Sequence, residues 1–190
     1  MTQQPNTVDL LLDLDETIFR QVADWKSPIL DGTLPSLSEI ASYSRIWIGV
    51  SLGLTAFGGA KGRRSAVLGM AAIGVTSALT NIALKGVTNR KRPQREVPAA
   101  RRLVHPESTS FPSGHTASAA AFSGVVGREM PGLWLPLNAL AGLVGFSRIY
   151  TGVHYPGDVL AGWLVGKLVA AMVRWVSRRF RRLQPATVQP

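Results

Sequence analysis

The stretch FPSGHTASAAAFSGVVG (residues 111–127) decides how this chain is organised. Ser113 is a good N-cap for the apolar run that follows, and Gly114 can present backbone N–H groups to an anion at the helix N-terminus. His115 would then lie in the first helical turn, beside that anion. The Ala, Gly and Ser residues that follow let helix backbones approach closely in a membrane bundle, so we expect a central helix. The turn alone is equally compatible with a plain helix start.

Composition narrows the possible functions. The chain has 190 residues, which is typical of one domain, and it contains no cysteine, which excludes disulfides, zinc-thiolate sites and cysteine nucleophiles. With 21 Lys+Arg against 11 Asp+Glu it is strongly basic. A basic chain can bind nucleic acid, an anionic membrane surface or an anionic substrate.

Two uncharged runs distinguish these partners. Residues 66–84 and residues 131–147 carry no charge, and a membrane span needs about 17 to 25 mostly apolar residues. The runs predict an integral membrane protein surrounded by membrane lipids, and nucleic-acid binding becomes a minor alternative. Nothing in the sequence indicates an oligomeric state.

We expect an all-α helical bundle of about five spans with an N-terminal amphipathic interfacial helix. We expect the chain to consist of an N-terminal amphipathic helix and connector at 1–39, a membrane-embedded domain at 40–176 and a basic tail at 177–190. The expected spans are 40–60, 66–84, 113–127, 133–146 and 159–176. Residues 61–64 are expected to form a tight basic turn between the first two spans.

The N-terminal helix, expected at 8–25 from apolar residues at every fourth position, contains a second motif. Its sequence LLLDLDET (10–17) is similar to the first motif of the haloacid dehalogenase phosphatases, an apolar strand that ends in Asp-x-Asp-x-Thr. Such enzymes need alternating strands and helices and later acidic residues for magnesium, whereas this chain continues into membrane-length apolar runs. We therefore expect Asp13 and Asp15 to lie on the solvated face of an interfacial helix.

Three ordered blocks carry a more specific resemblance. They are KGVTNRKRP (85–93), PSGH (112–115) and SRIYTGVHYPGD (147–158). Together they resemble the type 2 phosphatidic acid phosphatase superfamily, in its membrane lipid phosphatase and undecaprenyl-diphosphatase-like branch, over roughly residues 40–176. An odd number of spans places the second and fourth inter-span loops on one side of the membrane, so the three blocks converge on one face.

The residues themselves suggest a chemistry for that face. Pro156 fits the first position of a helix, which places His154 just before it and Asp158 in its first turn, where the two side chains can meet. A histidine held by a carboxylate has a fixed tautomer and raised basicity, and His154 is the strongest nucleophile candidate. His115 can protonate the departing alkoxide.

The superfamily resemblance implies the same roles. It implies a phosphohistidine at His154, backed by Asp158, with leaving-group protonation by His115. The phosphate is expected to be held by a group of cations and small residues, namely Lys85, Arg92, Ser113, Gly114 and Arg148. No metal or other cofactor is implied.

Several alternatives stay open. A metal site built from His105, His115, His154 and Asp158 lacks chelating spacing among its histidines. A non-catalytic lipid-binding protein would not need an intact nucleophile, and a transporter is suggested only by Lys167, the one charge well inside a span. The arginines of 86–111 other than Arg92, and Lys91 with them, are expected to be solvated or to face lipid.

The expected substrate is a phosphomonoester or diphosphate on a lipid, because the site lies at a bilayer surface. Polyprenyl diphosphate, phosphatidylglycerol phosphate, phosphatidic acid and a polyprenyl-phosphosugar phosphate fit equally. The short basic clusters at 61–64 and in the tail predict a cytoplasmic C-terminus and an extracytoplasmic active site.

Overall fold

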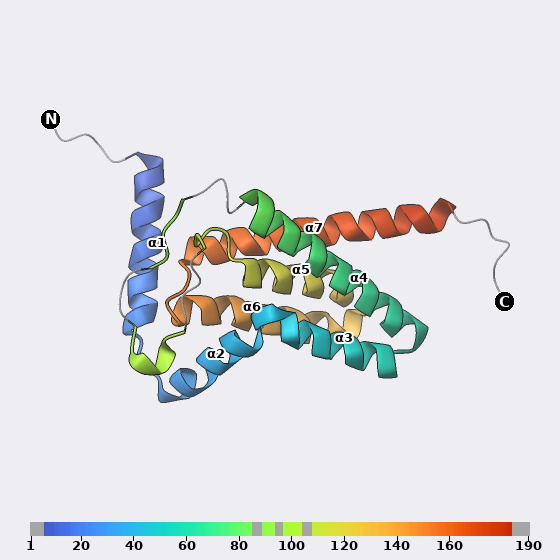
Figure 1. The fold of residues 1–190 in the computed structure, drawn as a ribbon, viewed down its shortest axis with the longest axis horizontal. Helices are drawn as coiled ribbons and strands as arrows, with labels where there is room; N and C mark the ends of the chain where they lie inside the picture. Colours follow the sequence, from blue (N-terminus) through green and yellow to red (C-terminus); the bar gives the residue numbers. More distant parts are fainter. Residues whose placement is uncertain (1–5, 85–88, 94–96, 104–107, 184–190) are drawn as a thin grey trace.

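The computed structural model describes residues 6–84, 89–93, 97–103 and 108–183. Throughout these ranges the regular structure is helical, which confirms the all-α prediction (Figure 1). The α-helices are α1 (Thr7–Asp24), α2 (Pro28–Ile40), α3 (Arg45–Phe57), α4 (Gly59–Ala78), α5 (Gly114–Glu129), α6 (Trp134–Tyr150) and α7 (Pro156–Leu183). Short 3-10 segments are η1 (Ser42–Ser44), η3 (Ala99–Arg101) and η4 (Pro131–Leu133), and η2 (Leu79–Leu84) is a π-helix.

Helix α5 is the centre of the bundle, as its small residues predicted. It begins after Ser113, whose side chain accepts a hydrogen bond from the backbone N–H of Thr116. Every residue from Thr116 to Gly127 is buried, and α5 packs against α4, α6 and α7 (Figure 1). A Cβ on Gly166 would lie 2.3 Å from the carbonyl oxygen of Ala117, so α7 reaches this distance from α5 only with glycine there.

Within the described ranges, three helical stretches are long and apolar enough to cross a membrane. They are Gly59–Ile82, Pro131–Tyr150 and Pro156–Leu183. Helices α3 and α5 contain 13 and 16 residues, fewer than the roughly 17 to 25 of an ordinary span. The predicted count of about five spans therefore stays a prediction. Helix α7 continues without a break past the expected boundary at residue 176.

Two expected boundaries in the first half are wrong. The span expected at 40–60 contains the end of α2, and its backbone breaks at Tyr43 and Ser44, which have φ of 54° and 59°. The basic turn expected at 61–64 is the first turns of α4. The chain reverses earlier, where Gly59 has a φ of 60°, a conformation that glycine adopts without strain.

Helix α1 lies across the end of the bundle where α7 begins, and it contacts α6 and α7 (Figure 1). Its buried residues are Asp15, Phe19 and Ala23, whereas Leu10 and Leu14 of the predicted apolar stripe are 54% and 55% exposed. The expectation of a solvated Asp15 is therefore wrong, because this carboxylate belongs to the face that packs on the protein. The interfacial position of α1 stays a prediction.

Arg101 also contradicts the expectation of a solvated basic loop. Its side chain is 1% exposed and donates to a carboxylate oxygen of Asp31 at 2.5 Å and to the carbonyl oxygens of Ala23 and Trp25. The guanidinium carbon lies 4.1 Å from the ring centroid of Tyr150. A buried arginine needs such partners, and here they join η3 to α2, α6 and the end of α1.

Candidate active site

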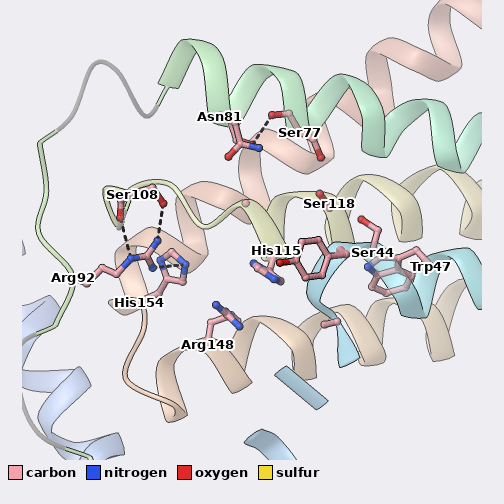
Figure 2. Close-up of a pocket in the computed structure, with 14 residues that line it drawn as sticks. Ser44, Trp47, Ser77, Asn81, Arg92, Ser108, His115, Ser118, Arg148 and His154 are labelled. Carbon is pink, nitrogen blue, oxygen red and sulfur yellow. Dashed lines mark hydrogen bonds between the residues drawn. The ribbon is translucent and has the colours of Figure 1, made fainter. Parts of the chain in front are cut away.

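A cavity of about 370 Å³ lies at the end of the bundle where α5 and α7 begin (Figure 2). Its wall contains Arg92, Gly114, His115, Arg148 and His154, which come from all three sequence blocks. The predicted convergence on one face is therefore found for these residues. The first residue of the expected phosphate-binding set, Lys85, lies outside the described residues.

His154 and Asp158 form the pair that their spacing predicted. His154 is 2% exposed and Asp158 is fully buried. The Nδ1 atom of His154 lies 3.5 Å from a carboxylate oxygen of Asp158, which is longer than an ordinary hydrogen bond. Nδ1 therefore has no hydrogen bond within the part of the chain that the structure describes. Catalytic hydrogen bonds of this kind often tighten when substrate binds. The arrangement orients the ring so that Nε2 faces the cavity side, where Arg92 lies.

Burial controls the charge of His154. The pKa of its imidazole is lowered to about 4, chiefly by removal from water and also by the nearby Arg148 and Arg92, while Asp158 acts in the opposite direction. Desolvation is the largest of these effects because a buried imidazolium loses its hydration. The ring is therefore neutral at physiological pH, which is the form that a nucleophile needs.

Arg92 is held in place by the loop that precedes α5 and by the loop that precedes α7. Its guanidinium donates to the carbonyl oxygens of Val153 at 2.7 Å and Ser108 at 3.0 Å. Its Nη1 lies 3.2 Å from Nε2 of His154 (Figure 2). Burial lowers the pKa of Arg92. An anion bound by this guanidinium would therefore sit next to the nucleophile candidate.

Arg148 is a second cation on the same cavity, at the end of α6. It is 4% exposed, and its Nη1 donates to the hydroxyl of Ser38 at 2.7 Å. Among the described residues, its Nε has no hydrogen-bond partner, and no carboxylate lies within ion-pair distance of it. A buried guanidinium with a spare donor is suited to an anionic ligand.

His115 and the start of α5 complete the wall. His115 is half-buried in the first turn of α5, and its Nε2 lies 3.4 Å from the hydroxyl of Ser42. Gly114 lines the cavity beside it. The hydroxyl of Ser113 is instead buried against Thr116, 2.9 Å from its hydroxyl oxygen. The backbone N–H of Ser113 donates to the carbonyl oxygen of Asp158 at 2.9 Å, which fixes α5 against α7.

The sequence matches the PAP2 superfamily over residues 65–182. The chain belongs to this superfamily. The match covers α5, α6 and nearly all of α7, and it begins within α4. Helices α1, α2 and α3 precede it.

Several PAP2 relatives have assigned functions. Phosphatidylglycerophosphatase B of Bacillus subtilis is 34% identical over 120 residues, 57% of each chain. Decaprenylphosphoryl-5-phosphoribose phosphatase of Mycobacterium tuberculosis is 33% identical over 146 residues, 77% of this chain and 80% of that enzyme. A crystal structure of a transmembrane PAP2-type phosphatidylglycerolphosphate phosphatase from Bacillus subtilis has a TM-score of 0.71 at 27% identity, covering 92% of this chain and 90% of the other. This chain is accordingly an integral membrane PAP2 enzyme, a lipid phosphatase.

The PAP2 site also contains residues that the sequence did not reveal. Ser38 of α2 holds Arg148, and Arg90, which was expected to be solvated, pairs with Asp158 at 2.8 Å. Arg90 lies two positions before Arg92, so an extended backbone places both side chains near the site. For Ser38 the sequence carries no comparable signal.

The described residues contain no group of three or more His, Asp or Glu side chains that could hold a metal ion. His105, a member of the alternative metal set, lies outside the described residues. His154 and Asp158 alone supply too few ligands for a closed site. Metal independence stays a prediction.

Proposed function

We propose that this lipid phosphatase works through a phosphohistidine on His154. In the first step, Nε2 of His154 attacks phosphorus while the bond from phosphorus to the departing oxygen breaks. The electron pair stays on that oxygen, and His115 delivers a proton to it. Asp158 accepts from Nδ1–H and stabilises the positive charge that develops on the ring.

In the second step, water attacks the phosphorus of the phosphohistidine. His115, now neutral, accepts a proton from that water, and the bond from Nε2 to phosphorus breaks. Inorganic phosphate leaves, and both histidines return to their starting states. The phosphoryl oxygens stay on the guanidinium groups of Arg92 and Arg148, the backbone N–H group of Gly114 and the ammonium of Lys85. Ser113 is left out of this set, because its backbone N–H already donates to the carbonyl oxygen of Asp158.

One observation carries this proposal. The neutral, buried ring of His154 has a carboxylate 3.5 Å from one nitrogen and a guanidinium 3.2 Å from the other. A phosphate drawn to that guanidinium is placed against the nucleophilic nitrogen. A non-catalytic lipid-binding protein or a transporter would need no such pair, and Lys167, which suggested transport, donates to Asn138 at 2.6 Å.

The test is phosphate release by the purified protein in detergent from a panel of four lipids. The panel contains a polyprenyl diphosphate, phosphatidylglycerol phosphate, phosphatidic acid and a polyprenyl-phosphosugar phosphate. We expect turnover of at least one lipid, and a rapid acid-free quench should trap labelled phosphate on the wild type. His154→Ala should lose both turnover and label. Label retained on His154→Ala would exclude this residue as the nucleophile.

The same assay tests the absence of a metal requirement. EDTA should leave turnover unchanged, because two guanidinium groups already line the cavity at which the phosphoryl charge is expected. If chelation abolished turnover and magnesium restored it, the histidine mechanism would be wrong.

We further propose that the active site faces away from the cytoplasm. The opposite end of the bundle contains the start of α4 and the second half of α7, which Arg64 joins by a 2.8 Å hydrogen bond to Ser177. Lys61, Arg63 and the exposed arginines of α7 therefore share one end, as cytoplasmic span-adjacent clusters do. A C-terminal reporter that is active only outside the cytoplasm should be silent in intact cells. An active reporter would reverse this orientation.

A further inference from the structure

The buried carboxylate of Asp158 has a second cationic partner, on the side away from His154. Arg90 donates from Nη1 to one carboxylate oxygen at 2.8 Å. The other oxygen accepts the backbone N–H of Tyr155 at 2.9 Å and faces Nδ1 of His154. The two oxygens therefore have separate partners, and Arg90 fixes the rotation that presents the second oxygen to the histidine.

Helix α1 in turn holds Arg90. Asp15 accepts from Nη2 of Arg90 at 2.5 Å, so the guanidinium bridges two carboxylates. It also lies 4.3 Å from the ring centroid of Tyr155, which makes an edge contact with Phe19 at 5.5 Å. The side chains of Arg90, Asp15 and Asp158 are 21%, 10% and 0% exposed. Such a fixed, mostly buried fork differs from a mobile surface ion pair.

Asp15 also contacts the start of α7 directly. Its second carboxylate oxygen accepts the backbone N–H of Gly157 at 2.6 Å, in the first turn of α7, where an anion is favoured. A Cβ on Gly157 would lie 2.8 Å from the Asp15 carboxylate. Glycine at position 157 is thus needed for α1 to come this close, so the contact depends on both Asp15 and Gly157.

We propose that Asp15 and Arg90 are positioning residues for the pair of His154 and Asp158, and that α1 is therefore part of the working active site. This inference rests on the proposed role of His154. Neither residue lines the substrate cavity, so neither is a catalytic residue. Asp15 lies outside the part of the chain that matches the superfamily, residues 65–182. It belongs to the motif that resembles the haloacid dehalogenase phosphatases, and in this protein that motif supports the PAP2 site instead.

The consequence is a loss of rate without a loss of binding. Asp15→Asn and Arg90→Gln should each lower kcat by about 10- to 100-fold, by analogy with the partners that orient metal-ligating histidines. KM should change little. Arg90→Lys keeps the charge but not the fork, so its kcat should lie between those of Arg90→Gln and the wild type. Asp13→Asn is the matched control for Asp15→Asn. Asp13 lies two positions before Asp15 on the exposed face of α1, so this variant should behave like the wild type.

The decisive measurement is single turnover with saturating enzyme, using the lipid of the panel that is hydrolysed fastest. The rate constant of phosphoryl transfer then does not depend on how much of a variant is folded. We expect a slower constant for Asp15→Asn and Arg90→Gln. The double variant should be slower than the wild type by less than the product of the two single losses, because part of the effect of Asp15 passes through Arg90.

Two results would overturn the inference. One is a wild-type rate constant in both single variants, and the other is a multiplicative loss in the double variant, which would indicate independent structural effects. Gly157→Ala supplies a second probe, because it displaces Asp15 without changing any charge, and it should slow the same step. His154→Ala in the same assay separates the two proposals: if it retains label, the proposed nucleophile fails, whatever Asp15→Asn does.

Discussion

The two ends of the bundle use arginine in opposite ways. At the end with the cavity, Arg101 and Arg148 are 1% and 4% exposed, and each has fixed partners. At the far end of α7, Arg178 and Arg182 are exposed to the surroundings. The residue type is the same, and what differs is the removal of the charge from water.

This difference determines which positions carry function. A buried guanidinium is costly unless every donor finds a partner, so its neighbours must be specified one by one. Arg148 keeps one donor without a partner among the described residues, and because Arg148 lines the cavity, this donor marks a place for a ligand. An exposed arginine needs no specified neighbour, and it contributes charge to a whole surface. We therefore expect substitutions to be severe at the first end and mild at the second.

After the loss of the nucleophile in His154→Ala, the strongest expected effect at the cavity end comes from His115→Ala. We expect a loss in kcat of roughly 10²- to 10⁴-fold, the range of general acid catalysis. The loss should be smaller for aryl phosphates, whose leaving groups need no proton, than for alkyl phosphates. Parallel assays on one substrate of each kind measure this. Equal losses on both would assign His115 a binding role instead.

Arg148→Met sharpens the comparison between buried and exposed arginines. We expect kcat/KM to fall by about 10²- to 10³-fold, as for removal of one donor that stabilises transition-state charge. Arg148→Lys should recover only part of this, because an ammonium cannot form a planar fork. Vanadate, a mimic of pentacoordinate phosphorus, should inhibit the wild type much more strongly than Arg148→Met. Equal inhibition of both proteins would place the phosphate elsewhere.

The first residues of the helices that begin at the cavity were predictable, because residues close in sequence determine where a helix begins. Ser113 caps α5, and Pro156 begins α7, as residue type and spacing indicated. His154 and Asp158 are four residues apart, so one turn of chain brings them together. Arg92 and Arg148 were predictable only because ordered blocks of this kind resemble a known superfamily.

The partners of the buried arginines were not predictable, because they are distant in sequence. Arg90 meets Asp15 and Asp158 across separations of 75 and 68 residues. In α1 the sequence predicted a solvated Asp15, whereas this carboxylate is buried in register with Phe19 and Ala23 on the face that packs on the protein. The exposed Leu10 and Leu14 are compatible with the predicted interfacial position, which stays a prediction.

The pH dependence of activity tests the burial of the cavity end. Burial lowers the pKa of His154 from 6.5 to about 4, and the nucleophile must be neutral. The acid limb of kcat/KM should therefore lie near pH 4, with about a tenfold loss per pH unit below it. An acid limb near pH 6.5, the ordinary pKa of histidine, would instead show that the His154 imidazole is solvated.

The lowered pKa of His154 also makes the free energy of unfolding depend on pH. Between about pH 6.5 and pH 4 the unfolded chain binds a proton at His154 that the folded protein does not. The contribution of the neutral His154 to the free energy of unfolding is fully present above pH 6.5, and it is lost as the pH falls through 4. Thermal unfolding in detergent should show a lower Tm at pH 4 than at pH 6.5, and a smaller difference in His154→Ala.

The smallest effect is expected at the basic end, for the pair Arg178→Met and Arg182→Met. Both side chains are exposed and lie at the opposite end of α7 from Asp158, so in detergent kcat/KM should stay within about twofold of the wild type. The two arginines are expected to affect membrane binding, because each arginine near an anionic surface contributes about 1 kcal/mol to the binding free energy. Relative to the wild type, the double variant should therefore lose more reconstitution efficiency with anionic vesicles than with neutral ones. A large loss of turnover in detergent would mean that the two ends of α7 are coupled, and the contrast between buried and exposed arginines would fail.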